Sequence, residues 1–155
     1  MTFNPRLLGY ALLLLAVGAS AQSLPRLGAT TGDVTVSGIS SGGYMAVQFQ
    51  VAYSSLVRGA GIVAGGPYHC AQGSVRRALN NCMAASGSDL PPTPDETLKT
   101  IRQLAEAGRI DPPKNLADDR VWLLAGGNDK TVLQPVMDAL DAFYRATLPA
   151  NAVSF

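Results

Sequence analysis

The motif Gly38-x-Ser40-x-Gly42 has the residue types and spacing of a nucleophile elbow. In such an elbow a serine occupies a sharp, strained turn between a strand and a helix, and small flanking residues prevent a collision between the two elements. The backbone N–H of Ser41, at the start of the helix, would then point toward a developing oxyanion. The motif therefore predicts Ser40 as a nucleophile and Ser41 as an oxyanion donor. The alternatives are a Gly- and Ser-rich loop, or Ser41 itself as the nucleophile.

A serine nucleophile needs a histidine base, and that histidine needs a carboxylate to orient it. Asp129 follows the apolar segment Arg120–Ala125 and two glycines, and the end of a later strand is where a Ser-Asp-His order places its acid. Asp129 is therefore the predicted acid, and its alternative role is that of a turn residue or helix cap. Asp118, Asp119 and Asp138 are weaker candidates because they fall in a loop or on a helix.

His69 is the single histidine of the chain, and it precedes Asp129. As the general base it would break the expected order of the triad. Its alternative interpretations are a substrate-binding residue and a loop histidine beside Cys70. We expect the catalytic histidine to lie beyond Phe155, so that this chain would be a fragment or a short form without its own base.

The elements around Ser40 form one supersecondary unit. Asp33–Ser37 is predicted as a short strand, Gly42–Ser55 as a half-buried helix, and Leu56–Ala64 as a second strand. A strand, tight turn, helix and strand in this order imply two parallel strands joined by a right-handed crossover.

The rest of the chain continues the alternation of helices and strands, which favours an α/β fold with a mostly parallel sheet. Thr93 or Asp95 is predicted to cap the clearest helix, which Gly108 would end. The expected elements are a weakly helical segment 71–88, a linker 87–94, a helix 93–108, a loop 109–119, a buried strand 120–125, a helix 133–148 and a strand beginning within 152–155.

The first 21 residues have the order of a secretory signal peptide. Arg6 supplies a positive region, Leu7–Val17 is apolar, and Ala19–Ala21 offers a small-residue cleavage site. The alternative, a membrane anchor, is disfavoured because the apolar run is shorter than the ~20 residues needed to span a bilayer. We expect a secreted protein, extracellular or periplasmic, whose residues 22–155 form a partial catalytic domain.

Charge and cysteines restrict the partners and the site types. Only 15% of residues are charged, and without Arg6 the chain would carry eleven acidic and eleven basic residues. We therefore expect no nucleic-acid partner. In an oxidising compartment Cys70 and Cys82 are disulfide candidates, with free thiols or outside partners as the alternatives. One histidine and no CxxC pair leave no expected metal site, and we expect no cofactor.

Two stretches of the sequence resemble secreted poly(3-hydroxybutyrate) depolymerases of the single-domain type. They are "VSGISSGGYMAVQFQVAYSSLVRGAGIVAGGPYHCAQG" and, less specifically, "VWLLAGGNDKTV". The resemblance implies a circularly permuted α/β-hydrolase, here incomplete at its C-terminus. It also implies Ser40 as the nucleophile, Asp129 as the acid and Ser41 N–H as one oxyanion donor.

The activity implied by the resemblance is hydrolysis of a polyester by acyl-enzyme chemistry. Elbow chemistry does not choose among acyl groups, so a feruloyl or acetyl esterase, or a peptidase of the same fold, is an alternative. A non-catalytic protein that keeps only a polymer-binding surface is a third hypothesis, because the chain has no histidine downstream of Asp129.

Overall fold

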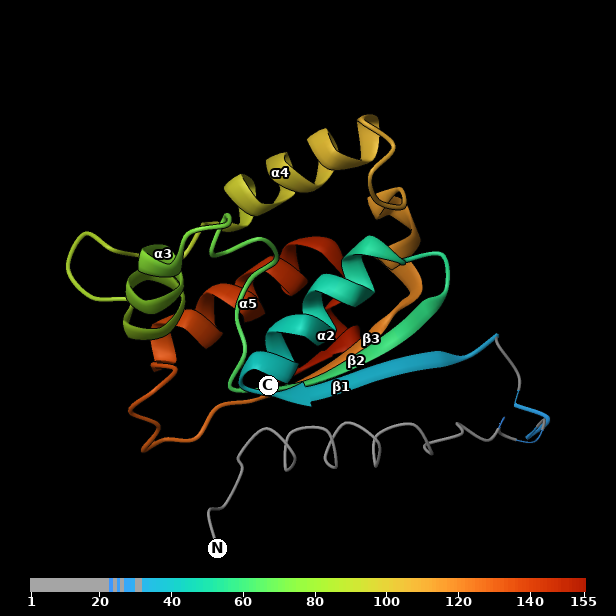
Figure 1. The fold of residues 1–155 in the computed structure, drawn as a ribbon, viewed down its shortest axis with the longest axis horizontal. Coiled ribbons are helices and arrows are strands. Elements are labelled where there is room, and N and C mark those ends of the chain that lie inside the picture. The colour runs from blue at the N-terminus through green and yellow to red at the C-terminus, as the bar shows by residue number, and fades with distance from the viewer. Residues whose placement is uncertain (1–22, 24, 26, 30–31) are drawn as a thin grey trace, which may run out of the picture. The chain divides into compact units, whose positions relative to one another are not determined.

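Four parallel strands in the order β1-β2-β3-β4 form the sheet of the computed structural model, which describes residues 23, 25, 27–29 and 32–155 (Figure 1). The predicted α/β class and the predicted strand near 152 are confirmed. The expected signal peptide lies outside the described residues. The strands are β1 (Val34–Ile39), β2 (Val57–Val63), β3 (Arg120–Leu124) and β4 (Val153–Ser154).

Three helices lie on one side of this sheet, as Figure 1 shows. They are α2 (Ser41–Ala52), α4 (Pro94–Glu106) and α5 (Gln134–Thr147). Two of them, α2 and α5, lie against the strands, and α4 lies farther out against α5. The predicted helix 133–148 is confirmed as α5, and its buried side chains recur at steps of three and four residues. They are Val136, Met137, Leu140, Phe143 and Tyr144. Within the described part of the chain, no helix has the length and apolar character needed to cross a membrane.

The start of α4 shows why the chain turns into a helix there. The Thr93 hydroxyl accepts a hydrogen bond from the Glu96 N–H, and the Glu96 carboxylate accepts one from the Thr93 N–H. This capping box satisfies donors that a helix N-terminus otherwise leaves unpaired, so Thr93 is the cap rather than Asp95. Gly108, with a φ of 67°, follows the helix in the left-handed region that glycine tolerates best.

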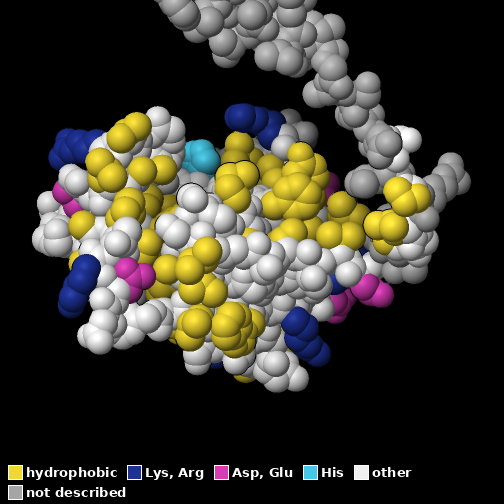
Figure 2. Space-filling view, turned by 60° about the horizontal axis from the view of Figure 1, so that its bottom comes forward, with side chains coloured by type: hydrophobic (Ala, Val, Ile, Leu, Met, Phe, Trp, Pro, Cys, Tyr) yellow, Lys and Arg dark blue, Asp and Glu magenta, His cyan; other side chains and the backbone are white. Residues whose placement is uncertain are grey.

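The opposite side of the sheet is open in the described residues. The predicted strand 120–125 is confirmed as β3, but the expectation that it is buried is wrong, because β3 alternates between exposed and buried side chains. Ile39 is 67% exposed, Trp122 49% and Leu124 45%. These three side chains define what we call the open sheet face. Figure 2 brings this side of the molecule forward and shows hydrophobic side chains on it, with charged side chains toward its margins.

Two other segments contain short helical elements: the first differs from the expected loop, and the second agrees with the expected weak helical character. The expected loop 109–119 contains a 3-10 helix, η3 (Pro113–Asp118), in which Pro113 occupies the first turn. The weakly helical segment 71–88 folds into a short helix, α3 (Val75–Leu79), followed by a π-helical turn, η2 (Asn80–Ala84). The helical elements in both segments are only five or six residues long, and such short helices leave little periodic pattern in the sequence.

A buried polar network joins α2, α5 and the segment before β3. The Tyr144 hydroxyl donates to Gln50 Oε1 over 2.7 Å, and Gln50 Nε2 donates to Asp119 Oδ2 over 2.8 Å. All three side chains are fully buried. Burial raises the pKa of the Asp119 carboxyl, and the hydrogen bond from Gln50 and the positive charge of Arg58 partly oppose this effect.

Candidate active site

Ser40 occupies the turn between β1 and α2, with a φ of 55° and a ψ of −123°. A non-glycine residue with positive φ is uncommon and is strained. The turn is held on both sides, because Ser40 N–H donates to Val63 O over 2.9 Å and Tyr44 N–H donates to Ser40 O over 3.0 Å. The predicted strand–turn–helix context of the elbow is therefore present. The Ser40 side chain is exposed at the carboxyl end of the sheet.

The glycines of the motif permit a close approach of strand and helix. A Cβ atom on Gly38 would lie 2.3 Å from the backbone carbonyl of Gly42, and one on Gly43 would lie 2.9 Å from Val63 O. A Cβ on Gly42 would meet nothing within 4 Å in the described structure. The close approach of strand and helix therefore requires glycine at positions 38 and 43. It does not require glycine at position 42, the second glycine of the motif.

Ser41 is the first residue of α2. The N–H groups of a helix's first turn have no acceptor within the helix, and the helix dipole makes this end positive. The backbone N–H of Ser41 is thus available to an anionic oxygen beside Ser40.

Asp129 lies five residues after β3, at the same edge of the sheet as Ser40. Its Oδ1 accepts from the N–H groups of Thr131 and Val132 over 2.7 and 3.1 Å, and its own N–H donates to Gly126 O. These hydrogen bonds are typical of a turn residue, which is the alternative role that the sequence predicts for Asp129. β1 and β3 are separated by β2, so their carboxyl ends stand about 10 Å apart.

The weaker acid candidates lie away from this edge. Asp119 directly precedes β3, so it lies at the amino end of the sheet, where it is buried against Gln50. Asp118 is exposed beside it. Asp138 is on α5 and accepts a hydrogen bond from Gln134.

A cavity of about 610 Å³ adjoins Ser40. It contains no Asp, Glu, Lys or Arg among its described lining residues, and most of its surface is apolar. The lining residues are Ser40, Ser41, Tyr44, Met45, Gln48, His69, Cys70, Ala71, Gln72, Gly73, Ala78, Cys82, Met83 and Val132.

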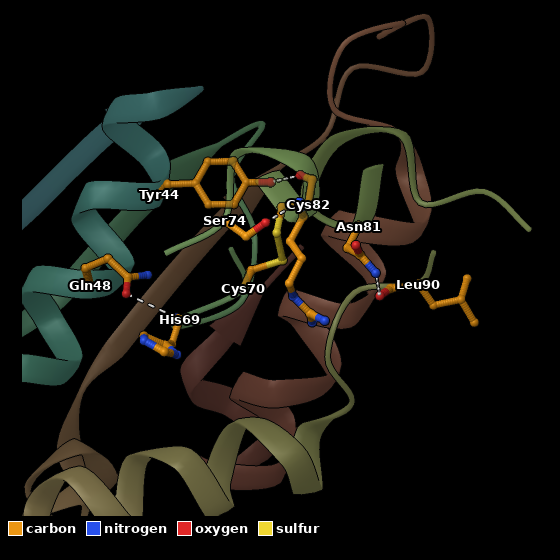
Figure 3. Close-up of a disulfide and its surroundings, with 9 residues drawn as sticks. Tyr44, Gln48, His69, Cys70, Ser74, Asn81, Cys82 and Leu90 are labelled. Atoms are coloured by element: carbon orange, nitrogen blue, oxygen red, sulfur yellow. Dashed lines mark hydrogen bonds between the residues drawn. A yellow bond between two sulfur atoms is a disulfide. The ribbon is translucent and has the colours of Figure 1, made fainter. Parts of the chain in front are cut away.

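One wall of the cavity is held by a disulfide. Cys70 and Cys82 are bonded to each other, so the expected pairing is present. The Tyr44 hydroxyl donates to the backbone O of Cys82, which ties the helix after Ser40 to the same wall (Figure 3). A Cβ atom on Gly66 would collide with the Tyr44 ring at 2.5 Å, so Gly66 makes room for this tie.

His69 lines the same cavity from the loop after β2. It has a φ of 56°, and its backbone N–H donates to Gln48 Oε1 over 3.1 Å (Figure 3). Sequence reasoning included His69 as a substrate-binding alternative but missed Tyr44, Gln48 and Gln72 as lining residues. The only signal for Tyr44 and Gln48 was their spacing of four and eight residues from Ser40 on a predicted helix.

Comparisons with known proteins agree with this arrangement. A poly(3-hydroxybutyrate) depolymerase of Delftia acidovorans is 44% identical over 151 residues, 95% of this chain. The chain is a relative of the poly(3-hydroxybutyrate) depolymerases. A polyhydroxybutyrate depolymerase of Talaromyces funiculosus is 37% identical over 83% of the chain. No family model matches the sequence.

Solved depolymerase structures show the same fold. The crystal structure of the PHB depolymerase from Penicillium funiculosum matches with a TM-score of 0.73 and 32% identity over 86% of the chain. A PHB depolymerase complexed with an R3HB trimer matches with a TM-score of 0.65 and 31% identity over 80% of the chain. The parallel sheet and its helices are therefore those of the α/β-hydrolase fold of these depolymerases.

The matched region is only part of each relative. The chain spans 30% of the Delftia depolymerase and 37% of the Talaromyces depolymerase. It covers 40% and 36% of the two crystallised depolymerase chains.

Proposed function

We propose that this chain supplies the nucleophile, one oxyanion donor and the acid of a serine esterase that hydrolyses poly(3-hydroxybutyrate). The observation that carries the proposal is the strained Ser40 at a strand–helix junction, on the wall of a largely apolar cavity. A cavity wall without Asp, Glu, Lys or Arg suits a neutral polyester. The likeness to depolymerases over 95% of the chain supports the same substrate class.

In the proposed reaction Ser40 Oγ attacks an ester carbonyl, and the Ser41 N–H stabilises the oxyanion that forms. A histidine takes the Ser40 proton and returns it to the leaving hydroxyl of the polymer. Asp129 orients that histidine. Water then attacks the acyl-enzyme, releases the acid product and restores Ser40.

We assign the general base to the part of the depolymerase fold that this chain does not span. His69 precedes Asp129 in the sequence, whereas in a Ser-Asp-His order the histidine follows the acid. The permuted order of the complete fold is part of the same proposal. So is export directed by residues 1–21, which would place the enzyme outside the cytoplasm. Other acyl esters and peptides are not favoured, because the relatives are polyester depolymerases.

A chimera in which residues 32–155 replace the matched segment of the Delftia depolymerase tests the proposal. Wild-type chimera should hydrolyse the (R)-3-hydroxybutyrate trimer, and Ser40→Ala should lower kcat by about 10⁴-fold or more, because it removes the nucleophile. The rate is the release of 3-hydroxybutyrate, measured by chromatography.

Ser41→Ala is the matched control, since alanine keeps the backbone N–H at the start of α2. Its kcat should stay within about tenfold of wild type, because the backbone donor is retained. Undiminished hydrolysis by the Ser40→Ala chimera would show that another residue is the nucleophile. A preference for aryl or sugar esters over the trimer would replace the substrate assignment, and trimer binding without hydrolysis would favour a polymer-binding role.

A further inference from the structure

Gln48 presents an amide group to the cavity from the second turn of α2. It lies on the same helix face as Ser41 and Tyr44, and all three residues line the cavity. Its Oε1 accepts the backbone N–H of His69 over 3.1 Å. This bond fixes the orientation of the amide, with the oxygen turned toward His69 and the nitrogen turned away from it (Figure 3).

The amide nitrogen of Gln48 is a free donor. In the described part of the chain, Gln48 Nε2 donates to no backbone or side-chain acceptor, although the residue is only half exposed. A primary amide nitrogen carries two donor hydrogens. A polar group with unused donors on a mostly apolar wall is suited to fix the orientation of a ligand.

The position of Gln48 separates it from the reacting carbonyl. With a rise of ~1.5 Å per residue, Gln48 lies roughly 10 Å farther along α2 than Ser41. A polyester of 3-hydroxybutyrate offers hydrogen-bond acceptors along its whole length, because every repeat unit carries an ester carbonyl. A simple monoester bound at Ser40 has no second carbonyl at that distance.

We propose that Gln48 Nε2 donates a hydrogen bond to the ester carbonyl of a repeat unit that is not being cleaved, and thereby makes the site select oligomers over monoesters. The proposal rests on the proposed function and adds a specificity-determining residue to it. His69 is the positioning partner, since its backbone N–H holds the Gln48 oxygen and leaves the nitrogen of this cavity-lining residue without a partner in the described structure.

A purely structural role for Gln48 is the competing explanation. In that role Gln48 would only hold the loop at His69, whose φ of 56° needs support from its surroundings. The two roles use different atoms of the amide. Gln48→Glu keeps an acceptor for the His69 N–H and replaces the donor nitrogen with an acceptor oxygen, so it removes the proposed role and retains the structural one.

An NMR titration that measures ligand binding to the 155-residue chain tests the proposal without requiring catalysis. The ligands are the (R)-3-hydroxybutyrate trimer and methyl (R)-3-hydroxybutyrate. Gln48→Glu should weaken trimer binding by about tenfold or more, because a donor becomes a repelling acceptor, and should leave the monoester Kd within about twofold. Gln48→Met, which removes both atoms, should weaken trimer binding by a similar factor.

Gln103→Glu is the matched control, because it makes the same chemical change on the exposed side of α4, outside this cavity. Its trimer affinity should equal that of wild type, and circular dichroism checks that each variant folds. Unchanged trimer affinity in Gln48→Glu would overturn the proposal. So would equal weakening for both ligands, or no trimer binding by wild type. Failure of the Ser40→Ala test in the chimera would instead remove the catalytic assignment and leave this binding result standing.

Discussion

Ser40 holds a backbone conformation that costs roughly 1–3 kcal/mol in a non-glycine residue. Five described non-glycine residues have positive φ, and three of them, Ser40, His69 and Gln72, line one cavity. Such strain persists only where the surrounding structure enforces it, as the backbone bonds of Ser40 to Val63 and Tyr44 do. The concentration of strained residues around one cavity is the pattern expected of a functional site.

Asp119 gives a residue-scale prediction about pH. Burial raises the pKa of its carboxyl in the folded state, so the folded chain binds this proton more readily than the unfolded chain. The contribution of Asp119 to stability is therefore largest below its ordinary pKa of ~3.9 and falls as pH rises toward the raised value. Asp119→Asn keeps an acceptor for Gln50 and should remove this fall, so the free energy of unfolding at pH 7 should increase.

Urea denaturation of the 155-residue chain and its variants between pH 4 and pH 7 measures this difference. Asp118→Asn is the control, because it removes a neighbouring acid that is exposed. The same pH dependence in wild type and Asp119→Asn would show that the Asp119 carboxyl does not control it.

Sequence reasoning reached the residues whose motif is local and missed those whose role depends on distant contacts. Ser40 was predictable because its motif and the adjoining elements lie within one continuous stretch. Asp119 was considered only as a loop acid, although it bonds Gln50, which is 69 residues away in sequence. Gln48 is a polar residue on a half-buried helix, and its spacing of eight residues from Ser40 is the only feature of its sequence context that points to the cavity.

At the scale of elements, the disulfide joins the loop after β2 to the turn η2, and both segments contribute to the cavity wall. Both cysteines are buried. Few regular elements support this wall, since α3 and η2 have five residues each. The disulfide and the hydrogen bond from the Tyr44 hydroxyl to Cys82 O therefore replace the packing that longer helices would provide.

Replacing both cysteines by serine should lower the free energy of unfolding by roughly 3 kcal/mol, because the disulfide closes a short loop that limits the unfolded ensemble. Urea denaturation of the double variant under oxidising conditions measures the loss. Wild type with its disulfide reduced provides the matched control and should show a similar loss. Equal stability of the oxidised wild type and the double variant would contradict the stabilising role.

The regular elements followed from the sequence more closely than the irregular ones. The two predicted long helices, α4 and α5, have strong periodicity and recognisable ends, and the structure places both within two residues of the predicted bounds. Pro113–Asp118 falls in a predicted loop because a short 3-10 helix leaves no clear periodic pattern. β3 was interpreted as buried because Val121, Trp122 and Leu123 are all apolar, whereas burial depends on whether another layer covers the sheet.

At the scale of the whole molecule, the open sheet face is the main departure from a usual parallel sheet. Such sheets are almost always covered on both faces. In the described residues the helices pack on one side, and Ile39, Trp122 and Leu124 remain exposed on the other. The chain spans 30% of the Delftia depolymerase, so a longer relative has additional chain that could cover such a face. Catalysis is therefore tested in a chimera with the longer depolymerase. Binding and stability are tested on the chain itself.

The most direct test of the central claim is to locate the covalent adduct that a fluorophosphonate forms with the chimera. An elbow serine that is activated by its base should react, and peptide mapping by mass spectrometry should place the adduct on Ser40. The adduct should be lost in Ser40→Ala and retained in Ser41→Ala. An adduct on Ser41 or on another residue, or labelling that persists in Ser40→Ala, would contradict the assignment of Ser40 as the nucleophile.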